Sequence, residues 1–123
     1  MEENSQGNSN SYKVVLVGES GVGKTSVTSY FLYNSFNESQ TPTDTATFAQ
    51  KLIEIKEINK TIEFDIWDTA GQEQYRSLAK LFYNGAKATI LVYDITDRRT
   101  FQEIQNYWFN EIKENSPDAV KYI

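Results

Sequence analysis

Two side chains that often carry enzyme chemistry are missing from this sequence, which has no cysteine and no histidine. Without cysteine the chain forms no disulfide, no thiolate nucleophile and no cysteine-ligated zinc site, and we expect no lipid anchor on it. Without histidine it lacks the commonest general base and the commonest ligand of transition metals. Any metal site must therefore use oxygen ligands, which favours Mg²⁺ or Ca²⁺.

Charge and hydropathy exclude further classes. The formal net charge of −5 argues against nucleic acid or an anionic membrane surface as a partner. No apolar run approaches the length of a transmembrane helix, and the first residues lack the hydrophobic region of a signal peptide. We expect a cytoplasmic protein with a disordered polar tail over residues 1–11 and one partial domain over residues 12–123.

The segment GESGVGKT, residues 18–25, matches the pattern G-x-x-x-x-G-K-[ST]. The apolar, β-branched run Val14–Val17 before it is typical of a buried parallel strand. After it, Val27, Tyr30 and Phe31 have the spacing of one helix face. This order of strand, glycine loop and helix is the context that supports a phosphate-binding loop.

The chemistry of such a loop assigns roles to its last two residues. Glycines let backbone N–H groups converge on phosphate oxygens, and the N-terminus of the next helix adds its positive dipole end. Lys24 then supplies a positive charge to the outer phosphates, and the Thr25 hydroxyl can bind Mg²⁺. The alternative is a glycine-rich turn with an exposed lysine.

A second phosphate-related region follows two predicted strands. Residues 51–68 form two extended runs around Asn59, which suits a turn, so we expect an antiparallel pair. Asp68 ends the second run, where a carboxylate reaches the ligand crevice of an open α/β sheet and can organise water around Mg²⁺. Alone, it could equally be a cap or turn residue. Gly71 could donate its N–H to a terminal phosphate, and the Gln72 amide could orient a water.

GESGVGKT together with DTAGQE, residues 68–73, resembles the Ras superfamily of small GTPases. QYRSLAKLFYNGA and KATILVYDITD, residues 74–97, are similar to the Rab family, with wording closest to endosomal Rabs. The resemblance implies a three-layer α/β P-loop domain whose sheet is mostly parallel with one antiparallel edge strand. It also implies a GTP/GDP switch of vesicle trafficking that hydrolyses GTP, with Mg²⁺ as cofactor. An exchange factor, a GTPase-activating protein and effectors are the implied partners, and the family reaches endomembranes through a prenylated tail.

The resemblance also implies residue roles. Nucleotide contacts fall on Ser20, Gly21, Val22, Gly23, Lys24, Thr25, Ser26, Phe36, Thr43 and Gly71, and metal contacts on Thr25, Thr43 and Asp68. Gln72 is the implied catalytic residue, and a partner is expected to supply the positive charge for the transition state. Taken alone, Phe36 fits a packing aromatic better, and Thr43 fits a polar loop.

Three aromatic residues, Phe48, Trp67 and Phe82, match the positions at which Rabs present a triad to effectors. The alternative is half-buried packing on the sheet. Residues 44–48, DTATF, depart from the usual Rab wording, and Gln74 stands where a basic residue is common. The departures leave the identity of any effector open.

The last third of the chain predicts a buried parallel strand at residues 87–96 and a helix at 97–115, capped by Asp97 or Thr100. Ile104, Trp108 and Ile112 give the helix a buried stripe.

A final apolar run would lead, in the family, to the Asn-Lys-x-Asp loop that reads guanine, and this sequence contains no such loop. We therefore expect a domain without its C-terminal part, with the strand at residues 87–96 left as an exposed edge. Two other functions stay open: a truncated binding module without turnover or stable nucleotide binding, and an ATP-using P-loop enzyme.

Overall fold

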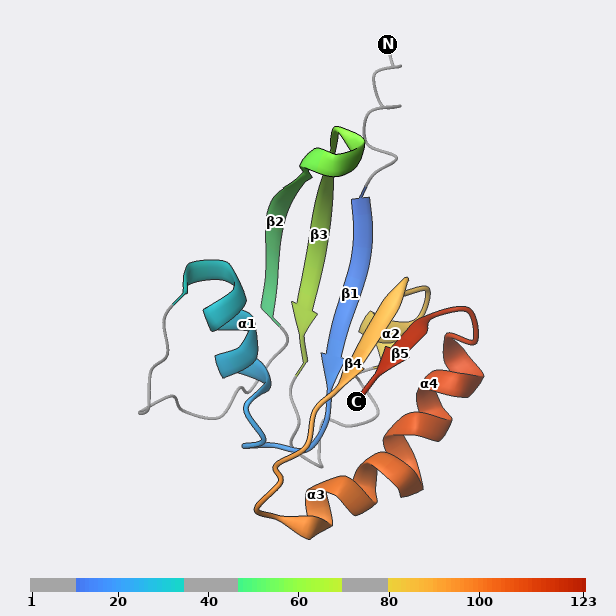
Figure 1. Ribbon diagram of the computed structural model, residues 1–123. Helices are drawn as coiled ribbons and strands as arrows, with labels where there is room; N and C mark the ends of the chain where they lie inside the picture. The colour runs from blue at the N-terminus through green and yellow to red at the C-terminus, as the bar shows by residue number, and fades with distance from the viewer. Residues whose placement is uncertain (1–10, 35–46, 70–79) are drawn as a thin grey trace.

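The computed structural model describes residues 11–34, 47–69 and 80–123, which form one five-stranded sheet with helices on both faces (Figure 1). The strands are β1 (Ser11–Val17), β2 (Thr47–Ile55), β3 (Lys60–Asp68), β4 (Ala88–Leu91) and β5 (Val120–Tyr122). The helices are α1 (Lys24–Tyr33), α2 (Lys80–Tyr83), α3 (Arg98–Glu103) and α4 (Phe109–Asn115). A 3₁₀ turn (Lys56–Ile58) joins β2 to β3, and a π-helical turn (Ile104–Trp108) joins α3 to α4.

The strand order is β2-β3-β1-β4-β5. All neighbouring pairs are parallel except β2 and β3, which are antiparallel, so the predicted mostly parallel sheet with one antiparallel edge strand is confirmed. Asn59 takes the left-handed conformation, with φ of 53°, in the tight connection that reverses the chain. β1 begins at Ser11, which the sequence analysis placed in the tail.

The expectation that β4 would be left as an edge strand is wrong. β5 pairs with β4 in parallel, with Ala88 opposite Val120, so β4 has β1 on one side and β5 on the other. The three residues of β5 pair with most of β4, because β4 itself has only four residues. The exposed edges of the described sheet are therefore β2 and β5.

The helices confirm the three-layer arrangement: α1 lies on one face of the sheet, and α2, α3 and α4 lie on the other (Figure 1). The core forms on the α2–α4 face, where side chains of β1 and β4 meet the helices: Val15, Val17, Tyr83, Ala86, Leu91, Ile104, Trp108 and Ile112. Ile104, Trp108 and Ile112 are at most 1 % exposed, so the predicted stripe is confirmed.

Asp97 caps α3 by accepting a hydrogen bond from the Arg99 N–H at 3.1 Å. Of the two predicted capping residues Asp97 is therefore correct, and Thr100 already lies inside the helix. The Thr100 hydroxyl is buried and donates back to the Asp97 carbonyl at 2.7 Å.

The α1 face is more open. The helix predicted from Val27, Tyr30 and Phe31 is confirmed, but these side chains are 49 %, 58 % and 40 % exposed. A groove of about 450 Å³ runs between α1 and the sheet, lined mainly by apolar side chains: Val14, Leu16, Val27, Thr28, Phe31, Ile53, Phe64, Ile66, Ala88, Ile90 and Tyr122. Over the described ranges, no helix has both the length and the hydropathy needed to cross a membrane.

Candidate phosphate and magnesium site

The loop between β1 and α1 has the backbone geometry of a phosphate cradle. Gly18, Gly21 and Gly23 have φ values of 148°, 80° and 106°, which residues with a Cβ rarely adopt. Gly23 is the N-cap of α1 and offers no side-chain cap, and the first turn carries no acidic side chain. The positive end of α1 therefore faces this loop without a carboxylate from its own first turn.

The loop lies directly against the end of β4. A Cβ built on Gly18 would come 2.3 Å from the carbonyl oxygen of Val92, so only glycine allows this approach. The Val92 N–H in turn donates to the Val17 carbonyl at 2.9 Å. These contacts place the loop at the carboxyl ends of the parallel strands, where ligands bind in open α/β sheets.

Lys24 is the charged group of the loop, and its side chain is 5 % exposed. Its ammonium donates to the Gly18 carbonyl at 3.1 Å and to the Glu19 carbonyl at 2.9 Å. Burial lowers the pKa of Lys24, and the charges of Asp68 and Glu19 oppose this effect. A phosphate group would supply the negative charge that favours the ammonium form.

Asp68 and Thr25 come together beside Lys24. Asp68 is 1 % exposed and ends β3, in register with Leu16 of β1. The Thr25 hydroxyl donates to Asp68 Oδ2. The other oxygen, Oδ1, is buried and has no hydrogen-bond partner within the described ranges. Burial raises the pKa of Asp68, while the Thr25 hydrogen bond and the Lys24 charge act in the opposite direction.

These two residues fit Mg²⁺. A buried carboxylate oxygen without a partner calls for an explanation, and a cation supplies one. A hydroxyl that donates its proton to a carboxylate can still offer oxygen lone pairs to a cation. In the described part of the chain, no three acidic side chains gather into a metal cage. Mg²⁺ suits such a sparse site because it commonly keeps several waters and binds substrate phosphates.

The remaining predicted ligands divide into two sets. Ser20 and Gly21 are exposed residues of the loop, and Val22 in the loop and Ser26 in α1 are half-buried. Phe36, Thr43, Gly71 and Gln72 lie outside the described residues and stay predictions.

The predicted aromatic triad forms one continuous row. Phe48 of β2 and Trp67 of β3 are cross-strand partners with ring centroids 4.6 Å apart, and Trp67 lies 5.2 Å from Phe82 of α2. Trp67 and Phe82 also pack against the core, while Phe48 is 47 % exposed. The geometry of this row is therefore compatible both with packing on the sheet and with contact to a partner protein.

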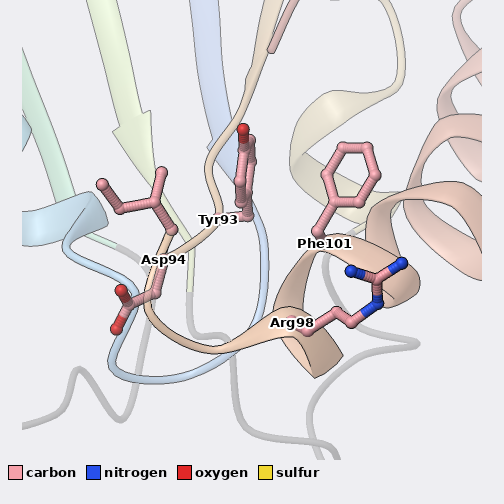
Figure 2. Close-up of a pocket in the computed structure, with 5 residues that line it drawn as sticks. Tyr93, Asp94, Arg98 and Phe101 are labelled. Carbon is pink, nitrogen blue, oxygen red and sulfur yellow. The ribbon is translucent and has the colours of Figure 1, made fainter.

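A second, smaller pocket of about 200 Å³ opens beyond the end of β4 (Figure 2). Tyr93 and Asp94 border it on one side, and Arg98 and Phe101 of α3 on the other. Asp94 Oδ1 accepts hydrogen bonds from the N–H and the hydroxyl of Thr96, which lower the pKa of Asp94. These bonds form the turn that leads into α3, so Asp94 has a structural role.

One contact of the phosphate loop was not predicted from the sequence. Trp108 Nε1 donates a hydrogen bond of 2.9 Å to the carboxylate of Glu19, 89 positions away. The sequence offers one signal, a carboxylate inside an anion-binding loop. A carboxylate there needs a positively charged group or a hydrogen-bond donor as its partner. Its partner could not be read from the sequence.

Comparison with known proteins agrees with this geometry. The Ras family model matches residues 13–123. A "Probable Rab-related GTPase" of Acanthamoeba polyphaga mimivirus is 42 % identical over 106 residues, which cover 86 % of this chain and 48 % of that protein. RabC of Dictyostelium discoideum is 41 % identical over 109 residues (89 % and 55 %), and mouse Rab-22A is 42 % identical over 108 residues (88 % and 54 %).

The chain spans about half the length of the curated relatives it matches. The match nevertheless covers β1 from residue 13 onward, the phosphate loop, the β2–β3 pair and the helices of the α2–α4 face. With its P-loop geometry and its mostly parallel sheet, the chain belongs to the Ras family, among the Rab-like small GTPases.

Proposed function

We propose that this chain binds GTP and GDP with Mg²⁺ and acts as a Rab-type switch of vesicle trafficking that hydrolyses GTP. One observation carries the proposal: Lys24, Thr25 and Asp68 gather at the phosphate loop, with both charged groups almost completely buried. Burial lowers the pKa of Lys24 and raises the pKa of Asp68, so in both cases it disfavours the charged form. A phosphate and a divalent cation would compensate both.

The chain's own groups would divide the work of binding. Backbone N–H groups of residues 20–25 cradle the inner phosphates, and Ser26 reaches the first phosphate. Lys24 would direct its third N–H to the outer phosphates while keeping its bonds to the Gly18 and Glu19 carbonyls. Thr25 and Asp68 would hold Mg²⁺, the first through its hydroxyl and the second through its carboxylate. The bound metal would spread the charge that develops on the phosphates.

Turnover and switching depend on residues outside the described ranges. Gln72 would orient the attacking water, while Thr43 and Gly71 would contact the terminal phosphate and lose that contact after hydrolysis. An activating partner would add a positive charge, so hydrolysis by the chain alone is expected to be slow. An exchange factor would open the site to release GDP.

The row of Phe48, Trp67 and Phe82 is the surface proposed for effectors. Its members span three elements and contact one another, so it forms one continuous aromatic strip. Phe48 is exposed and Trp67 and Phe82 are half-buried, and aromatic groups of this kind are favoured anchors in protein interfaces. Both ends of the row lead into segments 35–46 and 70–79, where the switch residues Thr43, Gly71 and Gln72 occur.

Binding is tested by titrating the purified chain with fluorescent GDP in Mg²⁺, with GTP and ATP as competitors. Displacement by GTP supports the proposal, whereas displacement by ATP in preference to GTP would favour the ATP-using alternative. Lys24→Met should weaken binding about 100-fold, because a charge-assisted contact to phosphate is lost. Lys56→Met, in the exposed 3₁₀ turn, is the matched control and should bind as the unsubstituted chain does. Absence of Mg²⁺-dependent guanine-nucleotide binding would contradict the proposal.

A second candidate is a binding module without turnover. It is favoured by the described geometry, which includes the residues proposed to bind phosphate and metal. Single-turnover hydrolysis of bound GTP separates the two candidates. Phosphate release that disappears in Gln72→Leu supports the GTPase, whereas binding without any release supports the module.

A further inference from the structure

The carboxylate of Glu19 stands inside a loop that is built to hold anions. A negative charge beside bound phosphate is unfavourable by itself. In the structure the Glu19 carboxylate is bound by the helical layer, because one of its oxygens accepts a 2.9 Å hydrogen bond from Trp108 Nε1. The contact joins the phosphate loop to the helical layer across 89 positions of sequence.

The Trp108 end of this contact is rigid. Trp108 has no exposed surface and packs in the core with β1 and β4 residues. It ends the π-helical turn, in which the Phe109 N–H bonds to the Ile104 carbonyl, five positions earlier. In a regular α-helix, positions eight apart drift by about 80°. The wider π turn offsets part of this drift, which keeps Ile104, Trp108 and Ile112 on one buried face.

At the other end of the Glu19–Trp108 contact, Glu19 is also hydrogen-bonded to Lys24. The backbone carbonyl of Glu19 accepts a hydrogen bond from the Lys24 ammonium at 2.9 Å. Glu19 therefore contacts Trp108 through its side chain and Lys24 through its backbone. The charge of Glu19 also acts against the effect of burial on the pKa of Lys24.

We propose that Glu19 and Trp108 are positioning residues, whose hydrogen bond anchors the phosphate loop to the helical core and thereby slows nucleotide release. The proposal rests on the proposed function of nucleotide binding. The loop needs an anchor because Gly18, Gly21 and Gly23 leave its backbone conformationally permissive. A loop held in its binding geometry loses less entropy when the ligand arrives, so affinity rises.

The hydrogen bond itself is tested without nucleotide, by the indole N–H signals in ¹⁵N NMR spectra of the full chain. The chain has two tryptophans, and Trp67→Phe assigns the signal of Trp108. Glu19→Ala should move this signal upfield and speed hydrogen exchange of the amides of residues 19–25. Glu19→Gln should restore most of both, because an amide oxygen can replace the carboxylate as acceptor. Glu57→Ala, an exposed carboxylate distant in the 3₁₀ turn, should change neither.

The positioning role is tested by the rate at which bound fluorescent GDP is released. Glu19→Ala and Trp108→Phe should each speed release about 10-fold, since each removes one partner of a charged hydrogen bond. The double variant should release GDP no faster than either single variant. Additive effects, or no change in either rate, would overturn the proposal, because Glu19 would then act by its charge or not at all.

The remaining outcomes are also decisive. If Trp108→Phe unfolds, Glu19→Ala is compared with Glu19→Gln in place of the comparison of single and double variants. Slow GDP release in Glu19→Gln supports the hydrogen bond. GDP release from Glu19→Gln that is as fast as from Glu19→Ala overturns it. If the unsubstituted chain binds no guanine nucleotide, the proposed function fails. The NMR and exchange measurements then decide whether the anchor exists, and an unmoved Trp108 signal in Glu19→Ala overturns it.

Discussion

At the scale of single residues, Lys24 and Asp68 show a conflict between stability and binding. Both side chains are at most 5 % exposed, and burial lowers the pKa of the lysine and raises that of the aspartate. Each shift disfavours the charged form that would bind phosphate or metal. Buried ionisable groups whose pKa values are shifted in this way are expected at functional sites, where a fold is less stable than it could be.

Asp68→Asn tests this conflict through pH. The pKa of Asp68 in the folded chain lies above its ordinary value of 3.8. The stability that this group contributes is therefore complete below that ordinary value and is lost as pH rises through the raised pKa. At pH 7 we expect the nucleotide-free Asp68→Asn chain to melt roughly 2–4 °C higher than the unsubstituted chain. The difference should shrink as pH falls toward 4.

The measurement is thermal melting followed by circular dichroism at several pH values. Asp118→Asn, at an exposed position, is the control and should show no such pH-dependent difference. The same Asp68→Asn chain should lose the Mg²⁺ dependence of nucleotide binding. A lower melting temperature for Asp68→Asn at pH 7 would show that its charge stabilises the fold.

At the scale of elements, the strand–loop–helix unit depends on how closely the loop approaches β4. Gly18→Ala would place a methyl group 2.3 Å from the Val92 carbonyl, a backbone atom that cannot move aside easily. We expect a loss of about 3 kcal/mol in the free energy of unfolding, measured by urea denaturation.

Gly21→Ala is the matched control within the same loop. Gly21 also has a positive φ, of 80°, but a Cβ there meets nothing within 4 Å. Its cost should therefore be only that of the backbone conformation, about 1 kcal/mol. Equal losses for the two variants would mean that the contact with Val92 does not restrain the loop.

At the scale of the whole molecule, the two faces of the sheet are unequal. On the α2–α4 face, Trp108, Ile104 and Ile112 close the core almost completely. On the other face, α1 leaves the apolar groove, with Phe31 and Tyr122 40 % and 62 % exposed. Exposed apolar side chains lining this groove favour association between molecules.

Val27→Glu should reduce that association, because Val27 lines the groove and is 49 % exposed. We expect lower binding of the dye ANS and a higher concentration at which light scattering first reports self-association. Ile95→Glu is the control, since Ile95 is 86 % exposed but lies outside the groove. If both variants act equally, the effect comes from net charge and the groove is not responsible.

Local sequence patterns sufficed for much of the site. The spacing of Gly18, Gly23 and Lys24 after an apolar run determines a loop that opens onto a helix, since each feature depends on neighbouring residues. The turn at Asn59 determines the antiparallel pair, and with it the place of Asp68 at the end of β3. Carboxyl ends of parallel strands meet at one edge, so Lys24, Thr25 and Asp68 could be grouped in advance.

The tertiary structure decided what depends on contacts between distant segments. The pairing of β5 with β4, the half-open face of α1 and the 89-residue separation between Glu19 and Trp108 follow from how the layers pack. Periodicity shows that a helix has an apolar face, but it does not say what covers that face. The sequence by itself therefore determined the loop chemistry and the antiparallel β2–β3 pair, because both depend on neighbouring residues. Only the packed fold determined what anchors the loop, because that partner comes from another layer.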